Sequence, residues 1–84
     1  MTPELEAKLD MIIEGIKAEV RRSADQHGHF TNAHEAWAVL HEEHDELWDE
    51  IKANRGYMPT AETEAIQTGA MAVRYILDLI KENV

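Results

Sequence analysis

Cysteine is absent from this 84-residue chain, and helix breakers and aromatic residues are few: two Pro, four Gly, two Trp, two Tyr and one Phe. Without cysteine, disulfides and thiolate metal ligands are excluded, and nothing indicates an oxidising compartment. No segment approaches the roughly 18 apolar residues of a membrane span, and the N-terminus lacks the basic head and apolar run of a signal peptide. We therefore expect a soluble intracellular protein with no membrane partner.

Positive charge is also scarce, because 8 Lys and Arg face 17 Asp and Glu, for a net charge of −9. A surface that follows nucleic-acid phosphates needs clustered positive charge, so nucleic acid is not an expected partner. An acidic protein can still bind a phosphorylated small molecule when metal ions supply the positive charge.

What the sequence does contain is helical periodicity in three segments, at about residues 3–22, 32–53 and 61–82. The first segment carries an apolar stripe formed by Leu5, Leu9, Ile12, Ile16 and Val20. The stretch SADQHGHFTN that follows lacks this periodicity and is predicted to be a loop.

Cap and turn residues bound the other two segments. Asn32, with Glu35 three positions later, is typical of a capping box at a helix start. The stretch NRGYMPT ends the second helix, with Gly56 suited to a left-handed turn and Pro59 to a new helix start. The fold class is therefore predicted to be all-α, a single domain of three helices over residues 1–84.

A chain this short buries only about 60% of the surface that its unfolded form exposes, so self-association is expected. Small residues on the third helix would allow another helix to approach closely: Ala65, Gly69, Ala70 and Ala72.

Acidic residues crowd the second helix, in the stretch LHEEHDELWDEI. Asp45 and Asp49 are expected on its solvated face, but Glu43 falls on the apolar side, between Leu40 and Leu47. Burying an unpaired carboxylate is costly enough that the group protonates or finds a cation. The sequence therefore predicts a cation beside Glu43.

Mg²⁺ or Mn²⁺ is the cation that such ligands favour. Glu43 and Glu46 project from adjacent turns, and carboxylate oxygens suit these hard cations. The third helix offers Glu64 and, one turn later, Gln67 as further ligands.

Three residues are candidates for binding a phosphorylated substrate. Arg74 and Asp78 continue the polar flank of Glu64, and an Arg beside a metal-carboxylate cluster can contact a phosphate. Lys52 is the third candidate, although a Lys at a helix end also complements the helix dipole.

Two acidic motifs carry a resemblance to a known family. The stretch EEHDE (42–46) resembles the E-E-x-x-E signature of the MazG-like, all-alpha nucleoside triphosphate pyrophosphohydrolases. The stretch EAIQ (64–67) stands where that family has its second motif, E-x-x-D, and the resemblance covers about residues 25–80. It departs from the family at Gln67, since an amide oxygen can coordinate a metal but brings no charge.

The resemblance implies a function and an assembly. It implies Mg²⁺-dependent hydrolysis of a nucleoside triphosphate to a monophosphate and pyrophosphate, with Glu43, Glu46 and Glu64 as metal ligands. It also implies a homodimer or homotetramer in which two subunits form a four-helix bundle. Short members occur in phages and bacteria, so the expected location is the cytoplasm of a bacterial or phage-infected cell. Glu42 or Glu50 is the candidate to accept the proton of the attacking water.

Other interpretations stay open at this stage. His41 and His44 suggest zinc, but His41 is expected to point to solvent and His44 to lie on the aromatic flank of the helix, which does not favour one shared metal. A base could lie under the loop residues His27, Phe30 and His34, or stack on Trp37 and Trp48. The alternative function is a non-catalytic regulatory or adaptor module that retains the helices and has lost turnover, which Gln67 favours.

Overall fold

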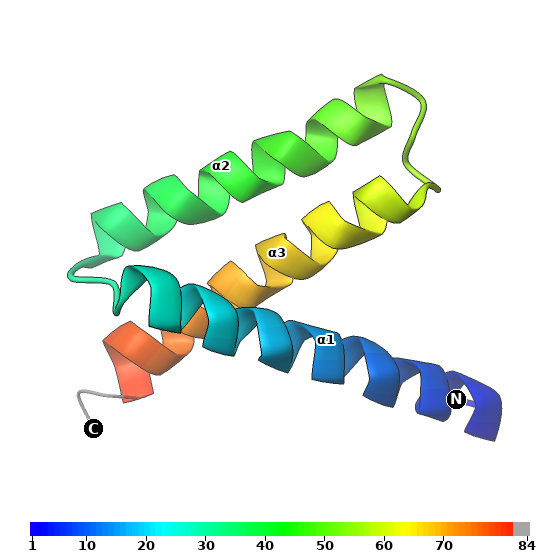
Figure 1. Cartoon of the computed structure of the whole chain (residues 1–84), viewed down its shortest axis with the longest axis horizontal. Coiled ribbons are helices and arrows are strands. Elements are labelled where there is room, and N and C mark those ends of the chain that lie inside the picture. Colours follow the sequence, from blue (N-terminus) through cyan, green and yellow to red (C-terminus); the bar gives the residue numbers. More distant parts are fainter. Residues whose placement is uncertain (82–84) are drawn as a thin grey trace.

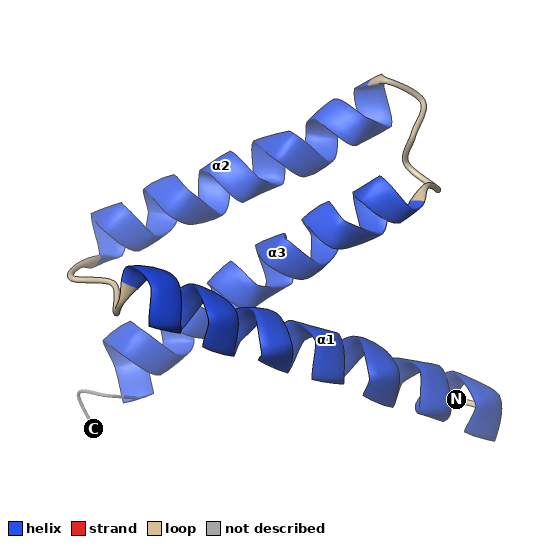
Figure 2. Cartoon of the chain, in the orientation of Figure 1, coloured by secondary structure: helices blue, strands red, loops and turns tan. Residues whose placement is uncertain are grey.

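The computed structural model describes residues 1–81 and consists of helices joined by short loops (Figure 2). The elements are α1 (Pro3–His27), α2 (Ala33–Lys52), α3 (Pro59–Tyr75) and the π-helical segment η1 (Ile76–Lys81). The predicted all-α, three-helix protomer is confirmed. The third predicted helix is divided into α3 and η1, and its last predicted residue, at position 82, lies outside the described residues.

Helix α1 is longer than predicted. Thr2 caps its start, accepting a hydrogen bond from the Leu5 amide, and the helix continues to His27, where Gly28 ends it at a φ of 75°. The prediction of a loop from residue 23 onward is therefore wrong for residues 23–27. Ser23, the first of them, is 2% exposed, and its hydroxyl donates to the Val20 carbonyl, so a polar residue is satisfied inside the helix.

Helix α2 begins as predicted. Asn32 is its N-cap, and its side-chain oxygen accepts from the Glu35 amide at 2.9 Å. The Glu35 carboxylate bonds the amide and hydroxyl of Thr31, one residue earlier than a capping box requires. After α2 the left-handed residue is Asn54, with a φ of 60°, and the prediction for Gly56 is wrong. Asn tolerates this conformation better than most side chains do.

The helices pack around α3 (Figure 1). Helix α2 runs antiparallel beside α3, and α1 crosses α3. Gly69 faces α1 at this crossing, because a Cβ atom added to it would lie 3.4 Å from the Ile16 side chain. The core is formed by Phe30, Ala36, Ala70 and Met71.

A buried ion pair fastens the loop between α1 and α2 to the end of α3. The Arg74 guanidinium lies 3.6 Å from Asp78, donates to the Gly28 carbonyl and packs over the Phe30 ring at 4.3 Å. Asp78 accepts from the Phe30 amide at 3.0 Å and lies 2.9 Å from Nδ1 of His29. Residues far apart in sequence therefore hold Phe30 in the core.

The N-terminal half of α1 extends beyond the α2–α3 pair (Figure 1). Leu5, Leu9 and Ile12 are 49%, 40% and 48% exposed, so the apolar stripe predicted from the sequence is covered by the protomer only around Ile16 and Val20. Over the described residues, helices long and apolar enough to cross a bilayer are absent.

Candidate metal centre

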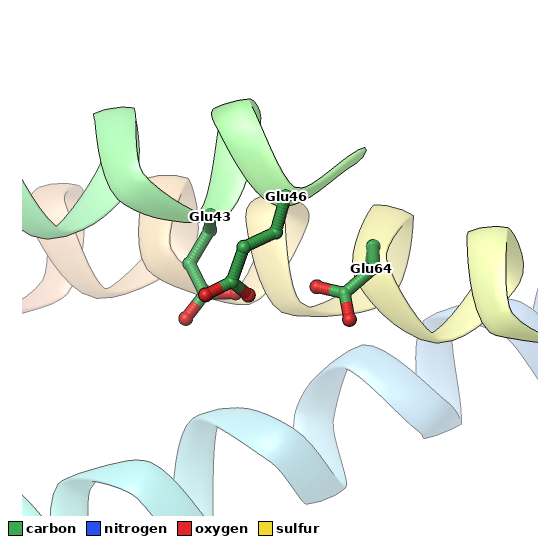
Figure 3. Close-up of side chains that lie close together, drawn as sticks. All are labelled: Glu43, Glu46 and Glu64. Carbon is green, nitrogen blue, oxygen red and sulfur yellow. The ribbon is translucent and has the colours of Figure 1, made fainter. Parts of the chain in front are cut away.

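Three glutamates predicted as metal ligands converge in the structure. Glu43 and Glu46 extend from α2 toward Glu64 on α3 (Figure 3), and one oxygen from each lies within 4.8 Å of the others. All three side chains are half-buried. We call Glu43, Glu46 and Glu64 the carboxylate triad. The helical spacing of the first two and the antiparallel packing of α2 on α3 bring them together.

The electrostatics of the triad reflect unpaired negative charge. Loss of solvation on burial, together with repulsion from Glu46 and Glu64, raises the pKa of Glu43 to about 7. Burial and the neighbouring Glu46 also raise the pKa of Glu64. Among the described residues, no Lys or Arg forms an ion pair with any member of the triad. A set of hard oxygen donors with excess negative charge fits Mg²⁺ or Mn²⁺.

Gln67 lies against the triad, and its side-chain amide can face the carboxylates in two orientations. In the orientation that satisfies its neighbours, the amide nitrogen donates to Glu43 and to Glu64, at 3.1 Å each. The reversed amide directs its oxygen at the same carboxylates, which is repulsive unless a cation lies between them. The Gln67 amide thus gives the metal-free triad two hydrogen bonds.

The two predicted proton acceptors have different surroundings. Glu42 is exposed, and its charge contributes to the raised pKa of Glu43. Glu50 accepts from Arg55 at 2.7 Å and from Thr60 at 3.0 Å, and these bonds lower its pKa. Glu50 therefore fastens the α2–α3 connection, and a lowered pKa makes it the weaker base.

The predicted substrate contacts have partners other than the triad. Arg74 and Asp78 form the buried pair described above, and Lys52 is exposed, with its ammonium 3.3 Å from Asp49 and 5.9 Å from the Trp48 ring centre. Within residues 1–81, no hydrogen bond or ion pair joins any of the three to the triad. Arg74 and Asp78 hold the fold together at this position.

The histidines offered for zinc are on the surface. Nδ1 of His41 lies 3.5 Å from Asp45, and Nδ1 of His44 lies 3.8 Å from the same residue. Among the described residues, the one group of three close ligand side chains is the carboxylate triad, to which no histidine belongs.

A cavity of about 370 Å³ adjoins the triad, between α1 and α2. Glu43 belongs both to its lining and to the triad. Of the loop and aromatic residues considered for base binding, His27 and Phe30 line this cavity, whereas His34 and Trp37 line a separate groove beside Tyr75. Trp48 is half exposed and lines neither.

Glu19 and Arg22 also line the cavity, and the sequence pattern assigns neither of them a role. They lie next to the point where the apolar stripe of α1 ends, and they pair with each other, with the Arg22 Nε donating to Glu19 at 2.9 Å. Both lie within the helix predicted from the sequence, on the turn that lines the cavity together with residues of α2. An acid and a base three positions apart on a helix predict such a pair, but they do not indicate a cavity beside it.

Comparisons of the chain with protein-family models, with curated proteins and with solved structures returned no match.

Proposed function

We propose that the protein is a Mg²⁺-dependent nucleoside triphosphate pyrophosphohydrolase that releases pyrophosphate and leaves a nucleoside monophosphate. The observation that carries this proposal is the convergence of Glu43, Glu46 and Glu64 within 4.8 Å, where burial and repulsion from the other two acids raise the pKa of Glu43 to about 7. The two motifs of the family resemblance supply these same three residues.

Each residue has a role that its position supports. The triad would hold the cation, which when bound offsets the charge of the triphosphate and lowers the pKa of a bound water. Gln67 would turn its amide oxygen toward the cation and, in its absence, return to donating to Glu43 and Glu64. Glu42, exposed and adjacent to Glu43, is better placed than Glu50 to accept a proton.

The direct test is a pyrophosphate assay. The protein is incubated with each of a panel of common and modified nucleoside triphosphates and Mg²⁺ or Mn²⁺, and pyrophosphate and orthophosphate are measured separately. Pyrophosphate is expected, and Glu43→Gln and Glu46→Gln should each lower its release by at least about 100-fold. The matched control is Glu62→Gln, an exposed acid in the first turn of α3, which should retain the activity.

The alternative function is a non-catalytic regulatory or adaptor module. The specific observation in its favour is that Gln67 satisfies Glu43 and Glu64 by hydrogen bonds, so that the triad has partners without a metal. Absence of turnover over the whole panel, together with no gain in thermal stability from either cation, would favour this alternative.

We also propose that a second copy of the chain covers the exposed stripe of Leu5, Leu9 and Ile12, as the family's bundle of two subunits would require. Sedimentation velocity should then give the mass of a dimer or a tetramer. Ile12→Glu should shift the protein toward the monomer, because the partner would bury that charge. Lys8→Glu, a change at an exposed polar position of the same helix, should not. A monomer at all concentrations would contradict this assembly.

A further inference from the structure

The cavity beside the carboxylate triad has an apolar base. Phe30 and Met71 are 7% and 4% exposed, and Val39 packs against them from α2. The volume of about 370 Å³ lies within the range of about 300–1,000 Å³ that small-molecule sites occupy. The cavity can therefore enclose a flat apolar group together with a polar attachment.

Charge on the cavity wall decides which part of a nucleotide is compatible with it. The charged lining consists of Glu19, Glu35, Glu42 and Glu43 against Arg22 and Arg74. The charge of Arg74 is offset by Asp78, and that of Arg22 by Glu19. A phosphate placed here would meet net negative charge, whereas an uncharged group with N–H and O–H donors would find acceptors.

The wall is also held in position before any ligand arrives. Phe30 is fixed from two sides, by the Arg74 guanidinium over its ring and by Asp78 at its amide. The Nε of Arg74, on the same wall, is buried and lacks a hydrogen-bond partner among the described residues. A preorganised wall lowers the ordering cost of binding.

From this lining and its junction with the triad at Glu43, we propose that the cavity binds the nucleoside part of the substrate, the base and its sugar. This inference rests on the proposed function, because it assigns the phosphates to the triad. Glu43 marks the boundary: a nucleoside in the cavity directs its phosphate chain past Glu43. The cavity then sets which base is accepted, through its shape around Val39.

The test changes the size of the cavity without touching the triad. Val39→Phe fills it and Val39→Ala enlarges it. Val73→Phe is the matched control, because Val73 is 43% exposed and lines a different groove, on the side of α3 that faces Ile16 and Val20. For each variant we would measure KM and kcat for purine and pyrimidine deoxynucleoside triphosphates, hydrolysis of inorganic tripolyphosphate, and Mn²⁺ affinity.

Val39→Phe should raise KM for deoxynucleoside triphosphates by about tenfold or more, with Mn²⁺ affinity and tripolyphosphate hydrolysis unchanged. Val39→Ala should change the ratio of kcat/KM between purine and pyrimidine substrates by about threefold or more, a readout that a purely structural role would not move. Val73→Phe should alter neither quantity. Pyrophosphate release with the same KM and the same base ratio in both Val39 variants would overturn the cavity assignment and leave the proposed function standing.

Equilibrium dialysis with deoxynucleoside monophosphates distinguishes a failure of the cavity assignment from a failure of the hydrolase proposal. If no triphosphate is hydrolysed, binding to the wild-type protein that Val39→Phe abolishes would support the nucleoside cavity while the hydrolase proposal fails. Neither binding nor turnover would overturn both.

Discussion

The two ends of the α3–η1 segment hold carboxylates away from solvent in opposite ways: Glu64 is half-buried and Asp78 is buried. Near its start, Glu64 joins Glu43 and Glu46 with no positive partner, and the pKa values of Glu43 and Glu64 are raised. Near its end, burial alone would raise the pKa of Asp78, but hydrogen bonds from His29 and Phe30, with the charge of Arg74, outweigh it and lower that pKa. Both regions are acidic and helical, so the presence or absence of a partner makes the difference.

This contrast separates a carboxylate that has charged partners from a group of carboxylates that has none among the described residues. Asp78 has the partners that a buried carboxylate needs, from Arg74, His29 and the Phe30 amide. The triad accepts hydrogen bonds from the Gln67 amide, which do not neutralise its negative charge. A bound cation would neutralise that charge. Strongly perturbed titration at a cavity edge is typical of functional sites.

Breaking the Arg74–Asp78 pair should have the largest effect on the free energy of unfolding. Asp78→Ala leaves Arg74 buried without its counter-charge and removes the acceptor of the Phe30 amide. We expect the free energy of unfolding to fall by about 3–5 kcal/mol in urea titrations. The double change Arg74→Met with Asp78→Leu should recover much of this loss, because no charge is then left unpaired. A loss below about 1 kcal/mol for Asp78→Ala would mean that the pair does not fasten the loop.

Removing the charge of Glu43 from the carboxylate triad should stabilise the protein. The folded-state pKa of Glu43, about 7, exceeds the ordinary carboxyl value of 4.5, so the folded protein binds more protons than the unfolded chain between these pH values. Its free energy of unfolding therefore falls as the pH rises from about 4.5 to 7. At pH 8 in EDTA, Glu43→Gln should gain about 1–2 kcal/mol and show a weaker dependence on pH.

Urea unfolding of both proteins at pH 5 and pH 8 checks this prediction. The His29–Asp78 pair is the same in both proteins, so its own dependence on pH cancels in the comparison. If Glu43→Gln were less stable than the wild type at pH 8, Glu43 would be paired in the folded protein and the contrast between the two ends would disappear.

Adding a negative charge beside the carboxylate triad should have the smallest effect on the free energy of unfolding. Gln67→Asp introduces an acid at this position and replaces two hydrogen bonds with repulsion from Glu43 and Glu64. In EDTA it should lower the free energy of unfolding by about 1 kcal/mol. In saturating Mn²⁺, Gln67→Asp should be more stable than the wild type. Calorimetry should show that it also binds Mn²⁺ more tightly. Gln67→Glu, with a longer side chain, tests whether position as well as charge matters.

The local features of the fold could be predicted from the sequence. Helical periodicity gave the three helices, and Asn32 identified the start of α2. The inward position of Glu43 followed from its place between Leu40 and Leu47, and the spacing of the motifs brought Glu64 to it. Each of these inferences rests on residues within a few turns of one another, or on the pairing of two adjacent helices.

What could not be predicted depends on contacts across the fold. The end of α1 lies past a polar stretch whose Ser23 is buried by packing, which helical periodicity does not register. Asp78 bonds residues of a loop nearly fifty positions earlier in the chain, so its position on the polar flank suggested a substrate contact rather than a core role. The cavity between α1 and α2 arises from the crossing of α1 over α3, a geometry that composition does not specify.

The most direct test of the account is the thermal stability of the wild type, Glu43→Gln and Glu62→Gln at pH 8, in EDTA and in Mn²⁺. A cation held by the triad at about a hundredfold its Kd should add about 2.7 kcal/mol of stability, which is a rise in Tm of roughly 10 °C or more for a chain of this size. We predict that rise in the wild type and in Glu62→Gln and its loss in Glu43→Gln. An equal rise in all three proteins would show that the ion binds the acidic surface at large, and would contradict a metal centre at Glu43.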